Sequence, residues 1–527
     1  MPTAPTYPGV YIEEVPSGVR TITGVATSVT AFLGRATRGP VDQATPLFSF
    51  ADYERMFGGL HEARPMSYAV RDFFRNGGSQ ALVVRAFKRG TGAAARGVAA
   101  GEVGTGAVQL KLEAANPGAW GNKLKAVVDF DGLGKIVAEN LGLAEGDLFN
   151  LKLTDEGTGR EEYFRNLTYR DHRRRVDRVL VQESSLARVA LKDDGQPDVP
   201  GTGLPPKGSA DFSDGNDGVV LKDAADWEGS AQARTGMHAL DKADLFNLLC
   251  IPPDTRDGNV PVGVWRAAAA YCRDRRAFLI VDADAEWALA SGSVAEAAKT
   301  GVAELALTGL EARNAALFFP RLLQPDPLRQ DQMDTFVPCG TVAGVMARTD
   351  AQRGVWKAPA GTDATLTGVS GLQTVLGDGE CGALNPKGIN CLRSLPVYGK
   401  VIWGTRTLRG DDQMADEYKY IPVRRLALFL EESLYRGTQW VVFEPNDEPL
   451  WAQIRLNIGA FMHSLFRQGA FQGTSPREAY FVKCDKETTT QDDINRGIVN
   501  ILVGFAPLKP AEFVFIRIQQ IAGQLAA

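Results

Sequence analysis

Side chains that could carry out catalysis are few in this chain and stand far apart. Its 4 histidines are His61, His172, His238 and His463, and none has metal-ligand spacing to another histidine or cysteine. No G-x-S-x-G elbow supports a hydrolytic triad, although residues distant in sequence can still meet in space. We therefore expect packing or surface roles for the histidines, and no catalytic residue.

Two local patterns invite a ligand-binding interpretation. Residues 377–382 match G-x-G-x-x-G, but a dinucleotide site needs a helix directly after this loop. Asn385-Pro386 follows at once, so we expect a turn here and no nucleotide. Asp282 and Asp284 stand just past a predicted strand, where ligand sites gather in α/β folds and two carboxylates could bind a metal. Capping of the next helix or solvent exposure is more common for such a pair, so the sequence predicts neither a metal nor a cofactor.

Composition excludes several classes of function. Lys+Arg 58 against Asp+Glu 63 gives a net charge of −5, which lacks the basic excess that phosphate binding needs, so no nucleic-acid partner is expected. The 6 cysteines form no C-x-x-C pair and are expected to be buried, reduced thiols. No signal-peptide pattern and no stretch of ~18 apolar residues is present, so we expect cytoplasmic synthesis without direct membrane insertion.

The elements that must position any site fall into several regions. Apolar runs and helical periodicity alternate from Phe246 to Phe319 and predict a parallel sheet covered by helices. Before them, four predicted strands between Val108 and Leu167 indicate an inserted, mostly-β domain, and a polar loop is expected from Asp193 to Gly218. Two amphipathic helices are predicted near the C-terminus, over residues 423–436 and from residue 446 to residue 468.

Both chain ends carry short amphipathic strand patterns, at residues 7–15 and 512–520. Prolines set each segment apart, and no hairpin turn links either one to a neighbour. An unpaired strand exposes backbone donors and acceptors, so we expect the segments to link subunits by strand pairing. The residues expected to do so are Val10, Tyr11, Ile12, Val514, Phe515, Ile516 and Ile518.

Motifs spread over most of the chain closely resemble contractile tail sheath proteins, of phage tails and of extracellular contractile injection systems. The matching segments are Tyr7 to Val19, Arg38-Gly39-Pro40, Asn116 to Asn122, Arg353 to Ala360, Ile389-Asn390, Trp403 to Leu408, Glu431-Glu432-Ser433, Gly437 to Asn446, Phe481 to Asp485 and Lys509 to Phe513.

The resemblance implies a multidomain α/β and α+β chain whose core domain is formed from both ends. The expected parts are an N-terminal arm (1–20), a first core part (21–90), a mostly-β outer domain (91–222), an α/β middle domain (223–345), a second core part facing the tube (346–508) and a C-terminal arm (509–527). The tube-facing candidates on the two C-terminal helices are Arg424, Arg425, Arg455 and Arg467, which lie mostly off the apolar stripes.

The function implied is that of a structural subunit that polymerises as stacked hexameric rings around an inner tube and contracts from a metastable extended state. The implied partners are other copies of itself, the inner tube protein, and baseplate and terminator or cap proteins. Assembly would take place in the bacterial cytoplasm, and the final location would be a virion tail or a tail-like particle. A hydrolase on the central α/β region and a non-contractile capsid or adhesin component stay open as alternatives.

Overall fold

The computed structural model describes residues 20–518, apart from residues 92–96, 202 and 291. The chain divides into two compact units, which we describe separately. The smaller unit takes its described residues from 20–27, 349–358 and 418–518, and the larger unit consists of 28–348 and 359–417. The smaller unit therefore joins residues from both ends of the chain, which agrees with a core formed from both ends.

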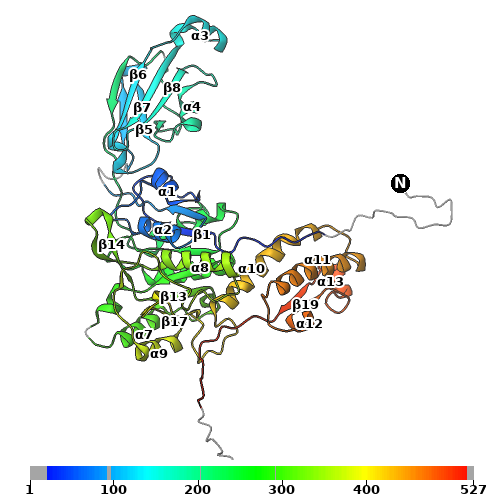
Figure 1. Ribbon diagram of the computed structural model, residues 1–527. Helices are drawn as coiled ribbons and strands as arrows, with labels where there is room; N and C mark the ends of the chain where they lie inside the picture. The colour runs from blue at the N-terminus through cyan, green and yellow to red at the C-terminus, as the bar shows by residue number, and fades with distance from the viewer. Residues whose placement is uncertain (1–19, 92–96, 202, 291, 519–527) are drawn as a thin grey trace, which may run out of the picture. The chain divides into compact units, whose positions relative to one another are not determined.

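An eight-stranded sheet organises the larger unit, in the order β18-β17-β13-β12-β11-β1-β3-β2 (Figure 1). Neighbours from β17 to β3 run parallel, and the outermost strands β18 and β2 are antiparallel. The strands are β1 (Thr30–Gly34), β2 (Thr45–Leu47), β3 (Ala81–Arg85), β11 (Leu248–Cys250), β12 (Phe278–Asp282), β13 (Ala315–Phe319), β17 (Ile389–Leu395) and β18 (Gly399–Ile402). Strands β1, β3, β12 and β13 are buried along their whole length, which explains their continuous apolar runs.

Helices and a small antiparallel sheet accompany this sheet. The helices are α1 (Phe50–Phe57), α2 (Pro65–Arg75), α5 (Ala224–Glu228), α6 (Val262–Asp274), α7 (Val294–Leu305), α8 (Cys339–Arg353) and α9 (Asp378–Leu384). The small sheet has the order β15-β14-β16, with β14 (Leu322–Asp326), β15 (Gln332–Phe336) and β16 (Gly371–Leu372). The order β11-α6-β12-α7-β13 with parallel pairing confirms the α/β pattern expected between Phe246 and Phe319.

Residues 28–90 lie in the same sheet as the α/β region, which differs from the expected grouping with the C-terminal helices. Strand β1 pairs in parallel with β11 on one side and with β3 on the other. Buried parallel strands are stabilised by such neighbours on both sides, and the strands of this sheet stand far apart in sequence. The other domain boundaries stay predictions.

The mostly-β insert has a core of its own, built on two antiparallel sheets with the orders β10-β6-β7-β8 and β4-β5-β9. Its elements are β4 (Ala100–Val103), β5 (Leu110–Ala114), β6 (Leu124–Asp129), α3 (Lys135–Leu141), β7 (Leu148–Asp155), β8 (Arg160–Thr168), α4 (Val176–Glu183), β9 (Ala187–Val189) and β10 (Gly208–Asp211). The expectation of an unbroken loop from Asp193 to Gly218 is wrong, because β10 pairs with β6 and Phe212 is buried in the core.

The smaller unit packs two long helices against a hairpin. Its elements are α10 (Ile421–Gly437), α11 (Glu448–Arg467), α12 (Pro476–Ala479), β19 (Tyr480–Lys483), α13 (Gln491–Asn495) and β20 (Leu502–Phe505). The apolar stripes of α10 and α11 form its core, to which Ile22 and Val355 contribute from distant parts of the chain. Within the described residues, no helix is long and apolar enough to cross a membrane.

Candidate functional site

The last described residues of the chain form the candidate linking segment, residues 513–518. Five apolar side chains here are largely solvent-exposed, at 69% for Phe513, 79% for Val514, 88% for Phe515, 81% for Ile516 and 93% for Ile518. No strand is formed over 512–518, and the rest of the predicted strand lies outside the described residues. A strand needs a hydrogen-bonded neighbour, so a segment that pairs only with another subunit is expected to lack strand structure in a single chain.

The base of the linking segment is held by the smaller unit. The Tyr420 hydroxyl, at the start of α10, donates a hydrogen bond to Glu512 Oε2 at 3.1 Å. The linking segment therefore starts from a fixed point and exposes its apolar side chains.

The N-terminal candidates Val10, Tyr11 and Ile12 lie outside the described residues. The described chain begins with residues 20–27, which lie along α10 and α11. The Arg20 backbone amide donates to Asn457 Oδ1 at 3.1 Å, and the Val25 amide donates to Ser433 Oγ at 3.2 Å. The residues just after the predicted N-terminal arm are thus anchored on the two helices.

Gly24 shows how closely this N-terminal segment approaches the helices. A Cβ atom at Gly24 would lie 2.8 Å from the Phe429 ring and 3.8 Å from the Phe461 ring. A side chain at residue 24 would therefore require the Phe429 ring or the segment to shift.

The hairpin β19–β20 offers a site for further strands. Its two strands pair antiparallel, from Tyr480 opposite Phe505 to Lys483 opposite Leu502. Within the described part of the chain, the sheet contains these two strands and no third. Phe481 and Leu502 keep 48% and 52% of their surface exposed. A two-stranded sheet is marginal alone, so added strands at its edges are stabilising.

The four candidate arginines differ in their surroundings. Arg467 is exposed near the end of α11. Arg455 is half-buried, forms an ion pair with Glu448 at 2.6 Å and donates to the Cys484 carbonyl. Arg424 pairs with Glu431 at 3.2 Å, and its guanidinium lies over the Tyr418 ring. Contact with a tube stays a prediction for these three positions.

The Arg425 side chain is buried inside the smaller unit. The expectation that it lies off the apolar stripe of α10 is therefore wrong. Its guanidinium donates to Asp350 at 3.0 Å and 2.5 Å and to the Thr27 carbonyl at 2.9 Å. Both charged side chains are less than 5% exposed. Burial raises the pKa of Asp350, and the charge of Arg425 opposes that rise. Arg425 thus joins residues from the beginning, middle and end of the chain.

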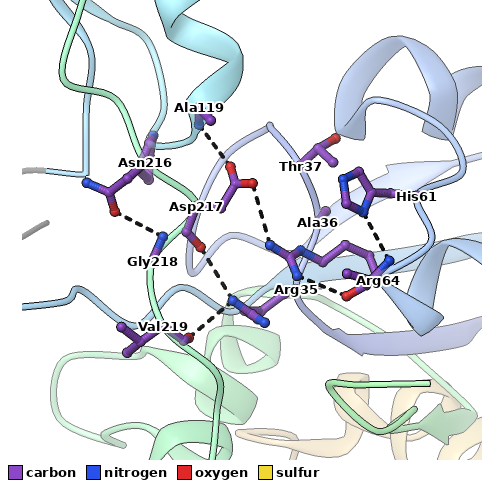
Figure 2. A network of polar contacts seen from close by, with 12 residues as sticks. Arg35, Ala36, Thr37, His61, Arg64, Ala119, Asn216, Asp217, Gly218 and Val219 are labelled. Atoms are coloured by element: carbon purple, nitrogen blue, oxygen red, sulfur yellow. Dashed lines mark hydrogen bonds and ion pairs between the residues drawn. The ribbon is translucent and has the colours of Figure 1, made fainter. Parts of the chain in front are cut away.

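A partly buried polar network joins the mostly-β insert to the residues that follow β1 and precede α2 within the larger unit (Figure 2). The Ala119 amide donates to Asp217 Oδ1 at 2.8 Å, and the other Asp217 oxygen lies 3.6 Å from Arg64 Nη2. Arg35 donates to the Val219 carbonyl at 3.2 Å and forms a buried ion pair with Asp254. Each group has a structural partner, so the network anchors the chain where the insert rejoins the sheet.

The histidines are engaged in local packing. The Nδ1 atoms of His61 and His172 accept backbone amides of Ala63 and Arg174, at 3.2 Å and 3.1 Å. His238 Nδ1 lies 3.5 Å from Asp241, and the His463 ring lies beside Phe466. In residues 20–518, outside the gaps stated above, none of these rings is bonded to a serine or cysteine side chain. The geometry offers no support for a triad at these positions.

The two ligand patterns also have structural roles. Residues 377–382 lie at and within α9, so the expected turn is wrong, because the helix starts inside the pattern. Glu380 accepts the Gly377 amide at 2.9 Å, and a carboxylate at this helix start disfavours a phosphate. Asp282 is buried and accepts the Cys339 amide at the start of α8 at 2.9 Å, so the expectation that it caps the next helix in sequence or faces solvent is wrong. No cluster able to hold a metal occurs in the described residues.

Comparisons with known proteins agree on one family. Residues 414–521 match the phage tail sheath C-terminal domain. A tail sheath protein of Vibrio phage KVP40 is 27% identical over 197 residues, which cover 37% of this chain and 28% of that protein. A putative prophage major tail sheath protein of Pseudomonas aeruginosa is 26% identical over 181 residues, 34% of this chain and 44% of the relative. The aligned stretch thus spans less than half of either curated relative.

Solved structures extend the likeness to nearly the whole chain. The contracted sheath complex of an extracellular contractile injection system, PVC, superposes with a TM-score of 0.58 at 21% identity and covers 98% of both chains. The contracted helical sheath of the anti-feeding prophage gives a TM-score of 0.57 at 24% identity, over 98% of this chain and 100% of that one. At such identities the likeness establishes the fold.

Proposed function

We propose that the chain is a contractile tail sheath subunit, which polymerises as stacked hexameric rings around an inner tube and contracts to drive that tube into a target; its similarity to tail sheath proteins supports this. The observation that carries the proposal is the exposed apolar segment 513–518 at the end of the sheath-type unit. A chain that functions alone gains nothing from five exposed apolar side chains, whereas a polymerising subunit can bury them against its neighbours.

Strand exchange is the proposed link between subunits. In an extended chain, Val514, Ile516 and Ile518 lie on one face of residues 513–518. This face can pack against a neighbouring subunit while the backbone forms hydrogen bonds with one of its strands. The hairpin β19–β20 of a neighbouring subunit is the acceptor we propose, because its edges can take further strands. Val10, Tyr11 and Ile12 of another subunit are proposed to complete the same sheet. A contact of this head-to-tail kind does not close on itself and produces an open helical polymer.

Contraction in this proposal needs neither a nucleotide nor an active site. Subunits assemble in an extended arrangement on the tube and baseplate, and triggering lets them reach a packing of lower free energy. The barrier between the two packings keeps the extended state kinetically stable. Support for a non-enzymatic role comes from the relatives, which are named as sheath proteins. A baseplate complex of the anti-feeding prophage is among the similar structures and supports the proposed baseplate partner.

The proposed tube contact uses exposed basic side chains of α11. Arg467 and Arg455 are the better candidates, because Arg425 is buried and Arg424 is only 11% exposed. A single exposed ion pair contributes about 0–1 kcal/mol, but a sheath repeats it at every subunit. Reversing Arg467 to Glu should produce sheaths that contract early or assemble without tube. Arg496→Glu, directly after α13 in the same unit and 64% exposed, is the matched control.

Negative-stain microscopy of the purified chain tests the function itself. Striated or hollow cylinders are expected, alone or with the tube protein. Uniform monomers that turn over a substrate would favour a hydrolase on the α/β region, and closed shells or short fibres would favour a capsid or adhesin component. Either of these results would overturn the sheath proposal.

A further inference from the structure

An aromatic side chain projects from the loop of residues 438–447, which joins α10 to α11 in the smaller unit. Phe443 is fully exposed, and Val442 before it keeps 63% of its surface exposed. The backbone of Phe443 has a φ of 70°, in the left-handed region that residues with a β-carbon rarely adopt. Such a conformation persists only where the surrounding structure fixes it.

Hydrogen bonds on both sides of Phe443 fix this loop. The Glu444 amide donates to the Val441 carbonyl at 3.1 Å, and Trp451 Nε1 donates to Asn446 Oδ1 at 2.9 Å. The Phe443 ring is therefore held out into solvent by a fixed backbone. Because the ring is fully exposed, it gains no burial from the described residues of its own chain, so a partner is needed to cover it.

A largely apolar groove of about 290 Å³ lies beside the second half of α11, in the same unit. Its apolar lining residues are Ile22, Phe429, Phe461 and Leu465. An apolar cavity of about 150 Å³ already admits benzene, so this groove has room for a phenyl ring. Aromatic rings at its surface would also make favourable contacts with a further aromatic ring.

One polar group in the groove lacks a partner. Asn457 lines the groove and is 2% exposed, and its Oδ1 accepts the Arg20 amide at 3.1 Å. Its buried Nδ2 group has no hydrogen-bond partner among the described residues. A buried donor without an acceptor costs free energy, which an incoming backbone carbonyl would recover. The groove thus offers an apolar surface and one donor.

We propose that the Phe443 ring of one subunit inserts into this groove of a second copy of the chain, where a carbonyl of residues 442–444 accepts from Asn457. A subunit cannot fill its own groove, because Phe443 precedes α11 whereas Phe461 lies roughly 20 Å along the helix axis from Glu448. A projecting ring and a groove at separate places on one unit form a head-to-tail contact, which continues from copy to copy. The inference rests on the proposed function and adds a second link beside the one formed by residues 513–518.

Phe443→Ala tests the projecting ring, since it removes no packing from the single chain and should leave the melting temperature unchanged. The concentration at which polymerisation begins, measured by sedimentation, should rise roughly 10-fold or more. Phe48→Ala, the same change at a side chain 66% exposed in the larger unit, should polymerise like the parent. Ser464→Trp fills the groove and should act like Phe443→Ala, whereas His463→Trp, exposed on α11 but outside the groove, is its control.

Photo-crosslinking identifies the surface that covers the ring. With p-benzoyl-phenylalanine in place of Phe443, irradiation of the assembled chain should couple this position to residues 456–467, the tryptic peptide that contains Phe461. The product should be absent at concentrations where the chain is monomeric. If the parent never polymerises, the proposed function fails and this contact with it. If the parent polymerises but Phe443→Ala does so as readily, or position 443 couples to another peptide, only this contact is overturned.

Discussion

Truncation of Ile516 separates the assembly contact from the stability of the subunit. The side chain is 81% exposed, so Ile516→Ala removes almost no packing from the single chain, and its melting temperature should stay within about one degree. If the side chain is buried between subunits, the same change costs about 2 kcal/mol per contact, at the low end of the range for Ile→Ala in a packed interior. That free energy corresponds to a roughly 30-fold higher concentration for the onset of polymerisation.

Light scattering and sedimentation over a concentration series measure that onset. The matched control is Ile136→Ala, the same change at a side chain on α3 that is 74% exposed and outside the linking segment. Polymerisation of the control should begin at the concentration of the parent protein. The reasoning is refuted if Ile516→Ala polymerises as readily as the parent, or if both variants are weakened equally.

Three further changes test other parts of the structure. Arg425→Ala leaves Asp350 buried without its partner, so denaturant unfolding should show that the free energy of unfolding falls by about 3–5 kcal/mol. An unchanged free energy of unfolding would contradict the buried ion pair. A short tag inserted after Gly195, in an exposed turn, should leave polymerisation intact. The same tag after Ala210, inside β10, should lower the melting temperature of the chain, because it interrupts the pairing with β6. If the chain tolerates both insertions equally, β10 is dispensable. Burial raises the pKa of Asp282 to about 7, so the folded state favours the neutral acid, and the stability that this provides is lost as pH rises from the usual value of 3.8 towards 7. Asp282→Asn still accepts the amide of α8, and its stability relative to the parent should rise by up to about 4 kcal/mol between pH 4 and pH 8; a constant difference would contradict the burial argument.

The strands of the large sheet were predictable where burial leaves a local signature. Residues 278–282 and 315–319 are apolar on both faces because parallel strands in this sheet are covered on both sides. Their neighbours were not predictable in the same way, because the pairing of β1 with β11 joins segments on opposite sides of the mostly-β insert. Strand β10 was missed because its short sequence, Gly208–Asp211, contains one small apolar residue and its pairing with β6 decides the structure.

The candidate site was also predictable only in part. The amphipathic pattern at 512–520 was readable, since alternation is a local property, but a single chain cannot show the strand that a neighbour completes. The hairpin proposed as acceptor was not predicted in full, because its first strand, Tyr480–Lys483, has only four residues of alternation. Arg425 was placed with the surface arginines because its partner Asp350 stands 75 residues away, and helix periodicity cannot reveal a charge brought in by another segment.

The division of the chain determines which fragments can exist by themselves. Because the boundaries fall at 27/28, 348/349, 358/359 and 417/418, the polypeptide crosses between the two units four times. A protease that cuts at one crossing divides the polypeptide into two chains, but three covalent connections between the two units remain. The segment 418–518, expressed as a separate polypeptide, would lack Ile22 and Val355 and would expose the apolar surface that they cover. The smaller unit is therefore contiguous in space but not in the gene, and only the nearly complete chain can produce it.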